Sequence, residues 1–363
     1  MFKAGTPRKM MRVLGTMSGT SLDGVDAAVL LSDGVDIASF EETAYRPYTT
    51  EEREVLRAAL GSWPGDPLVQ AAADVVELAH AELCARFEDI DLVGFHGQTL
   101  AHAPGGRGTH QAGSGQILVD ALGWPVISDF RSADVRLGGQ GAPLAPFYHH
   151  ALARRIGAQG PVVFLNLGGV ANVTWCDPYI SQPEQACLAF DCGPGNAAMD
   201  DAMRTRLGMP CDEGGALAAT GTPDDPLLDA FIGHEFFRRI PPKSLDRAAP
   251  VPNVSDLSNA DALATLTAAT ASGVALAFEH FPSPPQRVLV CGGGRHNRTL
   301  MTMITAGCDC PVDSVETAGL DGDMIEAQAF AYLAARVAYG LPTSSPYTTG
   351  VAAPVGGGTL HQP

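Results

Sequence analysis

Residues that can hold a phosphate group cluster between Gly15 and Asp26. This segment reads Gly-Thr-Met-Ser-Gly-Thr-Ser-Leu-Asp-Gly-Val-Asp, with apolar runs at Met11 to Leu14 before it and Val25 to Leu30 after it. The two apolar runs predict strands joined by a turn. Glycine permits unusual backbone angles and a close ligand, while hydroxyls and backbone amides can hold an anion. The segment is therefore either a phosphate-binding hairpin or an ordinary glycine-rich turn.

A second segment of the same kind starts roughly one domain length later. Val162 to Thr174 reads Val-Val-Phe-Leu-Asn-Leu-Gly-Gly-Val-Ala-Asn-Val-Thr, again two apolar runs around a small polar turn. Two copies favour two related domains that face one cleft. No GxxxxGK[ST] pattern occurs, and the lysines are Lys3, Lys9 and Lys243, which excludes a Walker loop. Phosphate charge must then be met by backbone amides, arginine and a metal ion.

Composition narrows the class of protein. The 363 residues fit about two domains. With 45% hydrophobic and 17% charged residues, the chain is neither disordered nor built around a membrane span, since its longest apolar runs are strand-sized. A net charge of -17 argues against a nucleic-acid partner. Eight scattered cysteines without metal-ligand spacing predict reduced thiols, mostly buried, and the N-terminus lacks a secretory signal, so we expect a cytoplasmic protein.

Strand and helix patterns alternate along the chain and predict an α/β fold. Besides the two hairpins, strands are expected at residues 36–45, 90–95, 125–128, 186–190 and 287–290. Helices are expected at residues 50–87 with a break at 61–67, and at 116–122, 197–207, 256–281 and 324–339. The Gly/Pro-rich stretch 136–146 is the best candidate for a domain boundary. We expect an N-terminal domain over 1–136, a C-terminal domain over 137–345, and a tail, 346–363, that packs back on the first domain.

Chemically capable residues follow several of these strands. The strand at 90–95 runs into His96-Gly97-Gln98-Thr99, and the strand at 125–128 runs into Asp129-Phe130-Arg131. In α/β sheets, ligands commonly bind at such strand ends. The strand at 287–290 ends in a triple-glycine turn, Gly292 to Gly294, with a helix expected near His296. Free amides at a helix start favour a nucleotide there.

In order along the chain, these segments closely resemble the anhydro-N-acetylmuramic acid kinase family. The resemblance spans Gly15 to Gly294 and also includes Gly138 to Pro143, Asp191 to Asn196 and Pro241 to Ser244. It implies two ribonuclease-H-like (actin-like ATPase) domains with mixed sheets flanked by helices and an ATP cleft between them. It also implies a homodimer that acts on 1,6-anhydro-N-acetylmuramic acid, ATP and water, giving N-acetylmuramic acid 6-phosphate and ADP in cell-wall recycling.

The resemblance also implies roles for individual residues. Asp191 is the expected base that activates water, with capping of the following helix as the alternative. The expected ATP-binding residues are Gly19, Thr20, Ser21, Leu22, Asp23, Gly24, Val25, Asp26, Asn166, Gly168, Gly169, Gly292, Gly293, Gly294 and Asn297. Asp23 and Asp26 either hold Mg²⁺ through water or hydrogen-bond the turn. Asp23 is also the second candidate for the base.

The expected sugar-binding residues are His96, Gln98, Arg131 and Glu326. Arg131 matches the lactyl carboxylate of the muramic sugar as a fork, unless it forms a surface salt bridge. Read alone, His96 is equally a turn histidine and Glu326 a solvated helical acid. Lys243 is either a structural tether or a phosphate contact. Two other functions remain open: a kinase of the same superfamily for another sugar or acid, and a non-enzymatic module switched by ATP.

Overall fold

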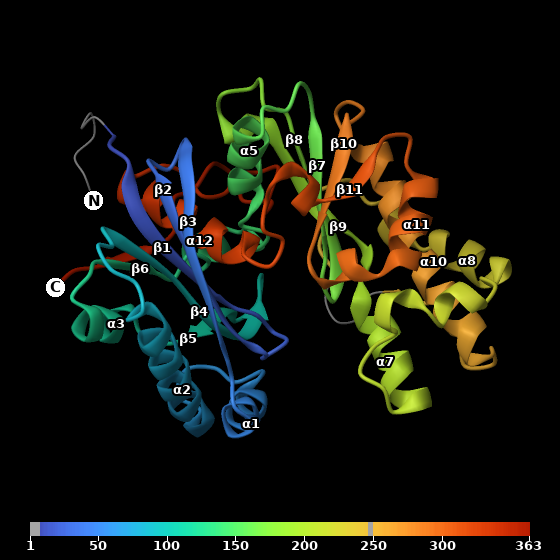
Figure 1. Cartoon of the computed structure of the whole chain (residues 1–363), viewed down its shortest axis with the longest axis horizontal. Helices are drawn as coiled ribbons and strands as arrows, with labels where there is room; N and C mark the ends of the chain where they lie inside the picture. Colours follow the sequence, from blue (N-terminus) through green and yellow to red (C-terminus); the bar gives the residue numbers. More distant parts are fainter. Residues whose placement is uncertain (1–7, 246–249) are drawn as a thin grey trace. The chain divides into compact units, whose positions relative to one another are not determined.

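The computed structural model describes residues 8–245 and 250–363, which form two compact units. Unit 1 contains the described residues up to Arg155 together with Met324–Pro363, and unit 2 contains those within Ile156–Asp323. Each unit is built on its own sheet (Figure 1). Met1 to Met10 match nothing in the family resemblance, so the sequence predicts that they are disordered, and all of them except 8–10 lie outside the described residues. Lys9, which is described, exchanges two hydrogen bonds between its backbone and the Tyr339 hydroxyl.

The sheet of unit 1 has the strand order β12-β6-β4-β1-β2-β3, with β5 paired to β4. β1, β2 and β3 are antiparallel, whereas β4 runs parallel to both β1 and β6. The tail returns to this sheet because β12 pairs with β6. The strands are β1 (Met11–Ser18), β2 (Gly24–Ser32), β3 (Ile37–Pro47), β4 (Leu92–Ala103), β5 (Gly108–Ala112), β6 (Val126–Ser128) and β12 (Thr359–His361).

The sheet of unit 2 repeats the same plan, in the order β11-β10-β7-β8-β9. Its first three strands are antiparallel, and β10 runs parallel to β7 and β11. The strands are β7 (Val162–Leu167), β8 (Val170–Cys176), β9 (Cys187–Pro194), β10 (Arg287–Cys291) and β11 (Val312–Ser314). Three antiparallel strands followed by two parallel ones, found in both units, confirm the expected pair of ribonuclease-H-like folds with mixed sheets.

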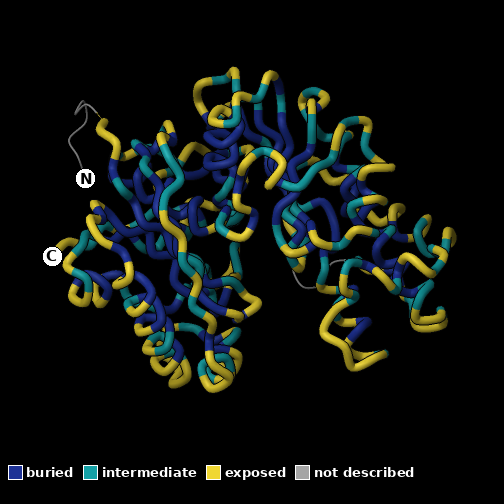
Figure 2. The backbone as a smooth tube through the Cα atoms, in the orientation of Figure 1, coloured by how far each residue is buried: buried dark blue, intermediate teal, exposed yellow. Residues whose placement is uncertain are grey.

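Helices pack on both sheets, and each unit has a core of buried apolar residues. Figure 2 shows the buried residues in dark blue. Unit 1 contains α1 (Thr50–Ala59), α2 (Pro67–Cys84), α3 (Gly115–Leu122), α4 (Ser132–Arg136), α5 (Pro146–Arg155) and α12 (Ile325–Ala338). Unit 2 contains α6 (Pro183–Ala186), α7 (Asn196–Leu207), α8 (Asp225–Ile232), α9 (Glu235–Arg238), α10 (Asn259–Ala277) and α11 (Arg298–Gly307). The expected break at 61–67 separates α1 from α2, where Asp66 caps the new helix and Pro67 occupies its first turn.

One helical segment, Asn259–His280, is long and apolar enough to cross a membrane by composition alone, yet 67% of its apolar window is buried in the structure. α10 contacts β9, α7, α8 and α11. It is therefore the core helix of unit 2.

The boundaries between the two units lie at other residues than the expected domain boundaries. The 136–146 stretch lies within unit 1, because its Gly139 and Gly141 amides bond to Asp134 and the following α5 packs on α12. α12 also lies within unit 1, packed on β1, β2 and β4, whereas 345 was expected to end the second domain. Composition alone did not indicate that the chain returns to its first sheet at Met324.

Close packing of α12 on β1 depends on Gly15. A Cβ atom added at Gly15 would lie 2.0 Å from the Ala327 carbonyl oxygen and 2.3 Å from the Ala331 nitrogen. Because these contacts are to helix backbone, a methyl group must push α12 away from the sheet.

We expect Gly15→Ala to lower the free energy of unfolding by about 2 to 4 kcal/mol, through overpacking and the helix shift that it forces. Urea denaturation followed by circular dichroism measures this loss. Gly106→Ala is the control, since its added Cβ has no contact closer than 3.4 Å. Equal stability of the two variants would contradict the packing argument.

Candidate active site

The turn of the first hairpin presents its backbone to solvent. Thr20 and Ser21 are exposed, whereas the neighbouring Leu22 side chain is buried. Leu22 adopts a positive φ of 57°, and its amide donates to the Gly19 carbonyl at 3.2 Å. A left-handed leucine is strained, and such strain concentrates at functional turns. The buried Leu22 side chain thus anchors a turn in which Thr20 and Ser21 are exposed.

A buried polar network supports this turn from below. The Ser18 hydroxyl donates to Gln98 Oε1 at 2.5 Å and lies 3.0 Å from the Tyr48 hydroxyl. Gln98 Nε2 donates to the Gly19 carbonyl at 3.2 Å. Gln98 is fully buried, so its carboxamide positions the turn. Ser18 and Thr16, expected among the anion donors of the turn, lie instead in β1 with hydroxyls bonded inside the protein.

Asp23 closes the same turn. Its carboxylate accepts a hydrogen bond from Ser21 at 2.8 Å, and its carbonyl accepts from the Tyr48 amide and the Tyr45 hydroxyl, both at 2.9 Å. Asp26 lies three residues further on, in β2. Among the described residues, no group of three or more His, Cys, Asp or Glu side chains could hold a metal ion. One or two carboxylates still fit Mg²⁺, which commonly takes its remaining ligands from waters and phosphates.

The Arg131 guanidinium is held in a fixed orientation. Its Nε donates to His96 Nε2 at 3.1 Å, and its Nη1 donates to the Gly141 carbonyl at 2.7 Å. His96 Nδ1 lies 2.8 Å from the Gly97 carbonyl, which favours a proton on Nδ1 and leaves Nε2 as the acceptor. Burial lowers the pKa of His96 well below its usual value, and Arg131 lowers it further. A neutral histidine therefore supports the charged arginine.

Glu326 and Asp129 complete this part of unit 1. Asp129, with a φ of 54°, accepts the Ser132 amide at 3.3 Å and so turns the chain into α4 after Arg131. Glu326 lies in the first turn of α12 and its residue is exposed. The pKa of Glu326 is raised above its usual value, because desolvation and repulsion from Asp23 outweigh the attraction to Arg131. Arg131 and Glu326 are thus electrostatically coupled.

In unit 2, the second hairpin turn meets the start of α7. The Gly168 carbonyl accepts the Asn196 amide at 2.7 Å, and the Gly169 carbonyl accepts the Gly195 amide at 3.0 Å. A Cβ at Gly195 would lie 2.2 Å from the Gly168 carbonyl oxygen, so only glycine fits. Asn196 Nδ2 adds a bond to the Leu167 carbonyl. The turn and the helix start therefore form one backbone structure.

The triple-glycine turn packs against the same hairpin. Gly292 has a φ of 75°, and its Cβ would lie 2.4 Å from Asn166 Oδ1. A Cβ atom added at Gly294 would lie 2.5 Å from the Leu167 Cβ atom. A short 3-10 turn, Gly293–His296, separates the glycines from α11, so the helix starts two residues later than expected. Asn297 caps α11 by accepting the Leu300 amide at 3.0 Å, which gives its side chain a structural task besides the expected nucleotide contact.

Asp191 lies within β9, the edge strand of unit 2, rather than after its end. The register shifts beside it, because Asn172 pairs with Asp191 and Ala171 pairs with Gly193. Such a bulge re-aims side chains. The half-buried Asp191 carboxylate accepts the Leu245 amide at 2.7 Å. Burial raises the pKa of Asp191 to about 6, even though the hydrogen bond from the Leu245 amide opposes this rise. A carboxylate tuned in this way suits proton transfer near neutral pH.

Lys243 is a tether for this edge strand. Its carbonyl accepts the Asp191 amide at 2.9 Å. Its ammonium donates to the Phe236 and Phe237 carbonyls at 3.2 and 3.1 Å, and lies 3.1 Å from His280 Nε2. These partners support a structural role for Lys243, which is one of the two expected roles.

Sequence interpretation missed Tyr48, whose hydroxyl lies 3.0 Å from the Ser18 hydroxyl. Its only signal in the sequence was a polar residue beyond the end of a strand.

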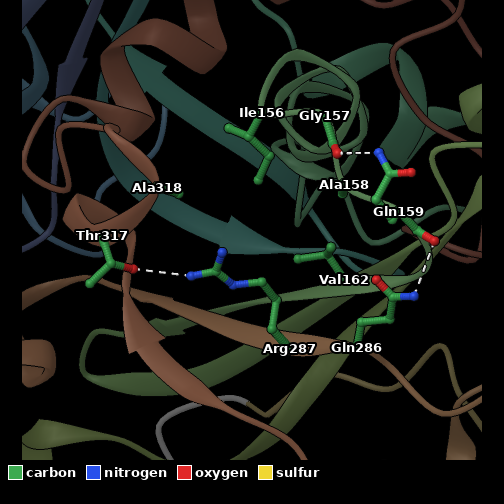
Figure 3. A pocket seen from close by; sticks show the side chains of 9 residues that line it. All are labelled: Ile156, Gly157, Ala158, Gln159, Val162, Gln286, Arg287, Thr317 and Ala318. Atoms are coloured by element: carbon green, nitrogen blue, oxygen red, sulfur yellow. Dashed lines mark hydrogen bonds between the residues drawn. The ribbon is translucent and has the colours of Figure 1, made fainter.

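One pocket of unit 2 lies away from these residues. It has a volume of about 430 Å³ and opens at the starts of β7 and β10, the strand ends opposite to the glycine turns (Figure 3). Arg287 spans one wall and donates to Thr317 and to Asp313. None of the predicted site residues lines this pocket.

A family model and relatives of known name match almost the whole chain. The family model described as "Anhydro-N-acetylmuramic acid kinase" matches residues 11–362. Relatives with that name in Cereibacter sphaeroides and in a Ruegeria species are 64% and 60% identical, covering 96% and 97% of this chain and 96% and 95% of their own. A solved ROK family glucokinase from Streptomyces griseus, in complex with glucose and AMPPNP, is 16% identical with a TM-score of 0.42, covering 89% of this chain and 99% of its own.

Proposed function

The chain belongs to the anhydro-N-acetylmuramic acid kinase family, and we propose that it converts 1,6-anhydro-N-acetylmuramic acid, ATP and water to N-acetylmuramic acid 6-phosphate and ADP with Asp191 as its general base. It is a phosphotransferase with an alcohol group as acceptor. The substrate places the reaction in the recycling of cell-wall sugars. The observation that supports the base is the half-buried Asp191 carboxylate with its pKa raised to about 6.

The proposed chemistry begins with a water molecule. Asp191 accepts a proton from the water as the water oxygen bonds to the anomeric carbon. The bond from that carbon to the 6-oxygen breaks, and the 6-oxygen takes the γ-phosphoryl group while ADP leaves. Positioning and electrostatics account for most phosphoryl-transfer catalysis. In this chain, backbone amides dominate because the glycine turns bring no lysine.

We assign ATP contacts to three backbone elements. The Gly19–Asp26 segment offers its turn amides with the hydroxyls of Thr20 and Ser21. The Asn166–Gly169 turn and the Gly292–Gly294 turn pack together in unit 2 through Leu167. Mg²⁺, when bound, neutralises phosphate charge, and Asp23 and Asp26 are the residues that would hold it through water.

Sugar recognition falls to Arg131 and its neighbours. Nε and Nη1 of Arg131 donate to His96 Nε2 and the Gly141 carbonyl, and Nη2 has no hydrogen-bond partner among the described residues. The guanidinium can therefore offer Nη2 to the lactyl carboxylate, with His96 and Glu326 nearby. Gln98 contributes by holding the Gly19 turn.

Two further properties belong to this proposal. The eight cysteines, all of them described, are reduced thiols, which supports our proposal of a cytoplasmic protein. A homodimer follows from the family resemblance, and light scattering on the purified protein tests it.

The first experiment measures ADP release by purified protein with Mg²⁺ and ATP, with and without 1,6-anhydro-N-acetylmuramic acid. Sugar-dependent ADP release and a product heavier by one phosphate and one water support the proposal. ADP release that ignores the sugar, or a product lacking the added water, contradicts it.

The pKa of Asp191 sets the expected pH dependence. A general base must be ionised, so activity is present above about pH 6 and is lost as Asp191 is protonated below it. We expect kcat/KM for the sugar to fall about tenfold per pH unit on the acid side. Rates between pH 5 and 8, measured with saturating ATP after a stability check at each pH, test this. A flat profile between pH 5 and 7 would contradict the assignment.

A further inference from the structure

Asp134 is a buried carboxylate that sequence interpretation did not single out. It lies in α4, three residues after Arg131, and is only 1% exposed. Its Oδ1 accepts the Gly141 amide at 2.7 Å. Its Oδ2 accepts the hydroxyls of Ser344 at 2.5 Å and Thr349 at 2.6 Å. Three short hydrogen bonds meet on one buried side chain, so Asp134 is a firm anchor.

One of these bonds leads directly to the substrate-binding arginine. Gly141 donates its amide to Asp134 and accepts Arg131 Nη1 with its carbonyl at 2.7 Å. The same loop is closed by the Gly139 amide, which donates to the Asp134 carbonyl at 2.9 Å. Gly141 has a φ of 68°, and a Cβ there would lie 2.6 Å from Val135. The loop therefore has little freedom once Asp134 holds it.

The other two bonds attach the C-terminal segment. Ser344 and Thr349 are buried, and the Thr349 carbonyl accepts the Gln140 amide at 2.7 Å. The side chain of Asp134 therefore bonds both to the loop that orients Arg131 and to the returning tail, and the tail also contacts this loop through the Thr349 carbonyl. A purely structural residue would affect stability through both contacts but would not change which substrates the enzyme prefers.

We propose that Asp134 is a positioning residue for carboxylate recognition, acting through the Gly141 carbonyl on Arg131. This inference rests on the proposed role of Arg131 in binding the lactyl carboxylate. Asp134 fixes the carbonyl that receives Nη1, while His96 receives Nε. Because Nε and Nη1 of the guanidinium are both held, Nη2 points in one fixed direction, toward the ligand. Without that restraint the Arg131 side chain is free to move before the substrate binds. Ordering it on binding then costs free energy and lowers the affinity.

The decisive variant is Asp134→Ala, which removes the acceptor of the Gly141 amide together with the acceptor of the two tail hydroxyls. We expect the KM for 1,6-anhydro-N-acetylmuramic acid to rise about tenfold or more, as follows from a buried amide left without its acceptor. The KM for ATP is expected to change less than about twofold. The preference for this substrate over 1,6-anhydro-N-acetylglucosamine, which lacks the carboxylate, is expected to fall by a similar factor of about ten.

Thr349→Val and Ser344→Ala are the matched controls. Each removes a tail hydroxyl from Asp134 but leaves the Gly141 bond. They are expected to lower the melting temperature without changing the substrate preference. If they reduce the preference as much as Asp134→Ala does, the effect comes from the tail and the proposal is overturned.

Hydrogen exchange gives a readout that needs no substrate. The Gly141 amide is expected to exchange faster in Asp134→Ala and to remain protected in Thr349→Val. Unchanged protection in Asp134→Ala would overturn the proposal even if the kinase activity were established. If the wild-type protein shows no sugar-dependent turnover, the proposed function fails, whereas the exchange result still decides whether Asp134 holds this loop.

Discussion

Asp191→Asn is expected to lower kcat by about a thousandfold while leaving ATP affinity within about twofold of the wild-type value. The amide keeps the shape of the side chain and can still accept the Leu245 amide through its oxygen. It cannot take a proton from water, so the attack on the anomeric carbon loses its base. Steady-state kinetics at saturating sugar and ATP, with ATP binding measured by calorimetry, separate the two effects.

Asp200→Asn is the matched control for this prediction. Asp200 is another half-buried carboxylate of unit 2, on α7, and burial raises its pKa as well. No role in the reaction is assigned to it, so its substitution should leave kcat within about threefold of the wild-type value, as for most changes outside the machinery. If Asp191→Asn instead turns over at nearly the wild-type rate, Asp191 is not the base. Another carboxylate must then take that role, and Asp23 is the first to test.

The two hairpins and their glycines were predictable from sequence. Their apolar runs are long enough to define strands, and glycines at Gly168, Gly169 and Gly292 leave few other interpretations. The structure also explains the glycines by contact, since a Cβ at Gly292 would overlap Asn166. Local pattern sufficed here because the turn and its flanking strands are adjacent in the chain.

The strand ends were less predictable. Strand β4 was expected to end at Phe95, yet it continues to Ala103 and pairs with β5, which was not expected. Its register against β1 shifts between Thr16 and Ser18, where Gly97 has a φ of 72°. Bulges allow polar residues such as His96 to remain within a strand, so the end of an apolar run is a poor guide to the end of the strand.

Long-range contacts were beyond the reach of sequence patterns. Asp134 meets Ser344 and Thr349 more than 200 residues away, and Lys243 pins Asp191 across 52 positions. Nothing in the local composition around Asp134 distinguishes it from other helical aspartates. Its importance arises only because α12 and the tail return to the first sheet. Residues of this kind have to be found in the fold.

Arg131→Ala is the second substitution with a large expected effect. Removing a guanidinium that pairs with a carboxylate costs about 1.5 to 3 kcal/mol, so the KM for the sugar should rise by about 10-fold to 100-fold while the KM for ATP stays nearly constant. Arg131→Lys keeps the charge but loses the planar fork held by His96 and Gly141. It should therefore recover only a small part of the affinity. Arg136→Ala, at the exposed end of α4, is the control.

The substrate can be varied in the same experiment. 1,6-Anhydro-N-acetylglucosamine lacks the lactyl carboxylate, so it should lose little when Arg131 is replaced, and the two substrates should become nearly equal in Arg131→Ala. If both substrates instead weaken by the same factor, Arg131 supports the general shape of the site and another cation must read the carboxylate. If neither weakens, the bonds from Arg131 to His96 and Gly141 serve the fold alone. The ratio of the two KM values therefore separates recognition from structure, which neither value does by itself.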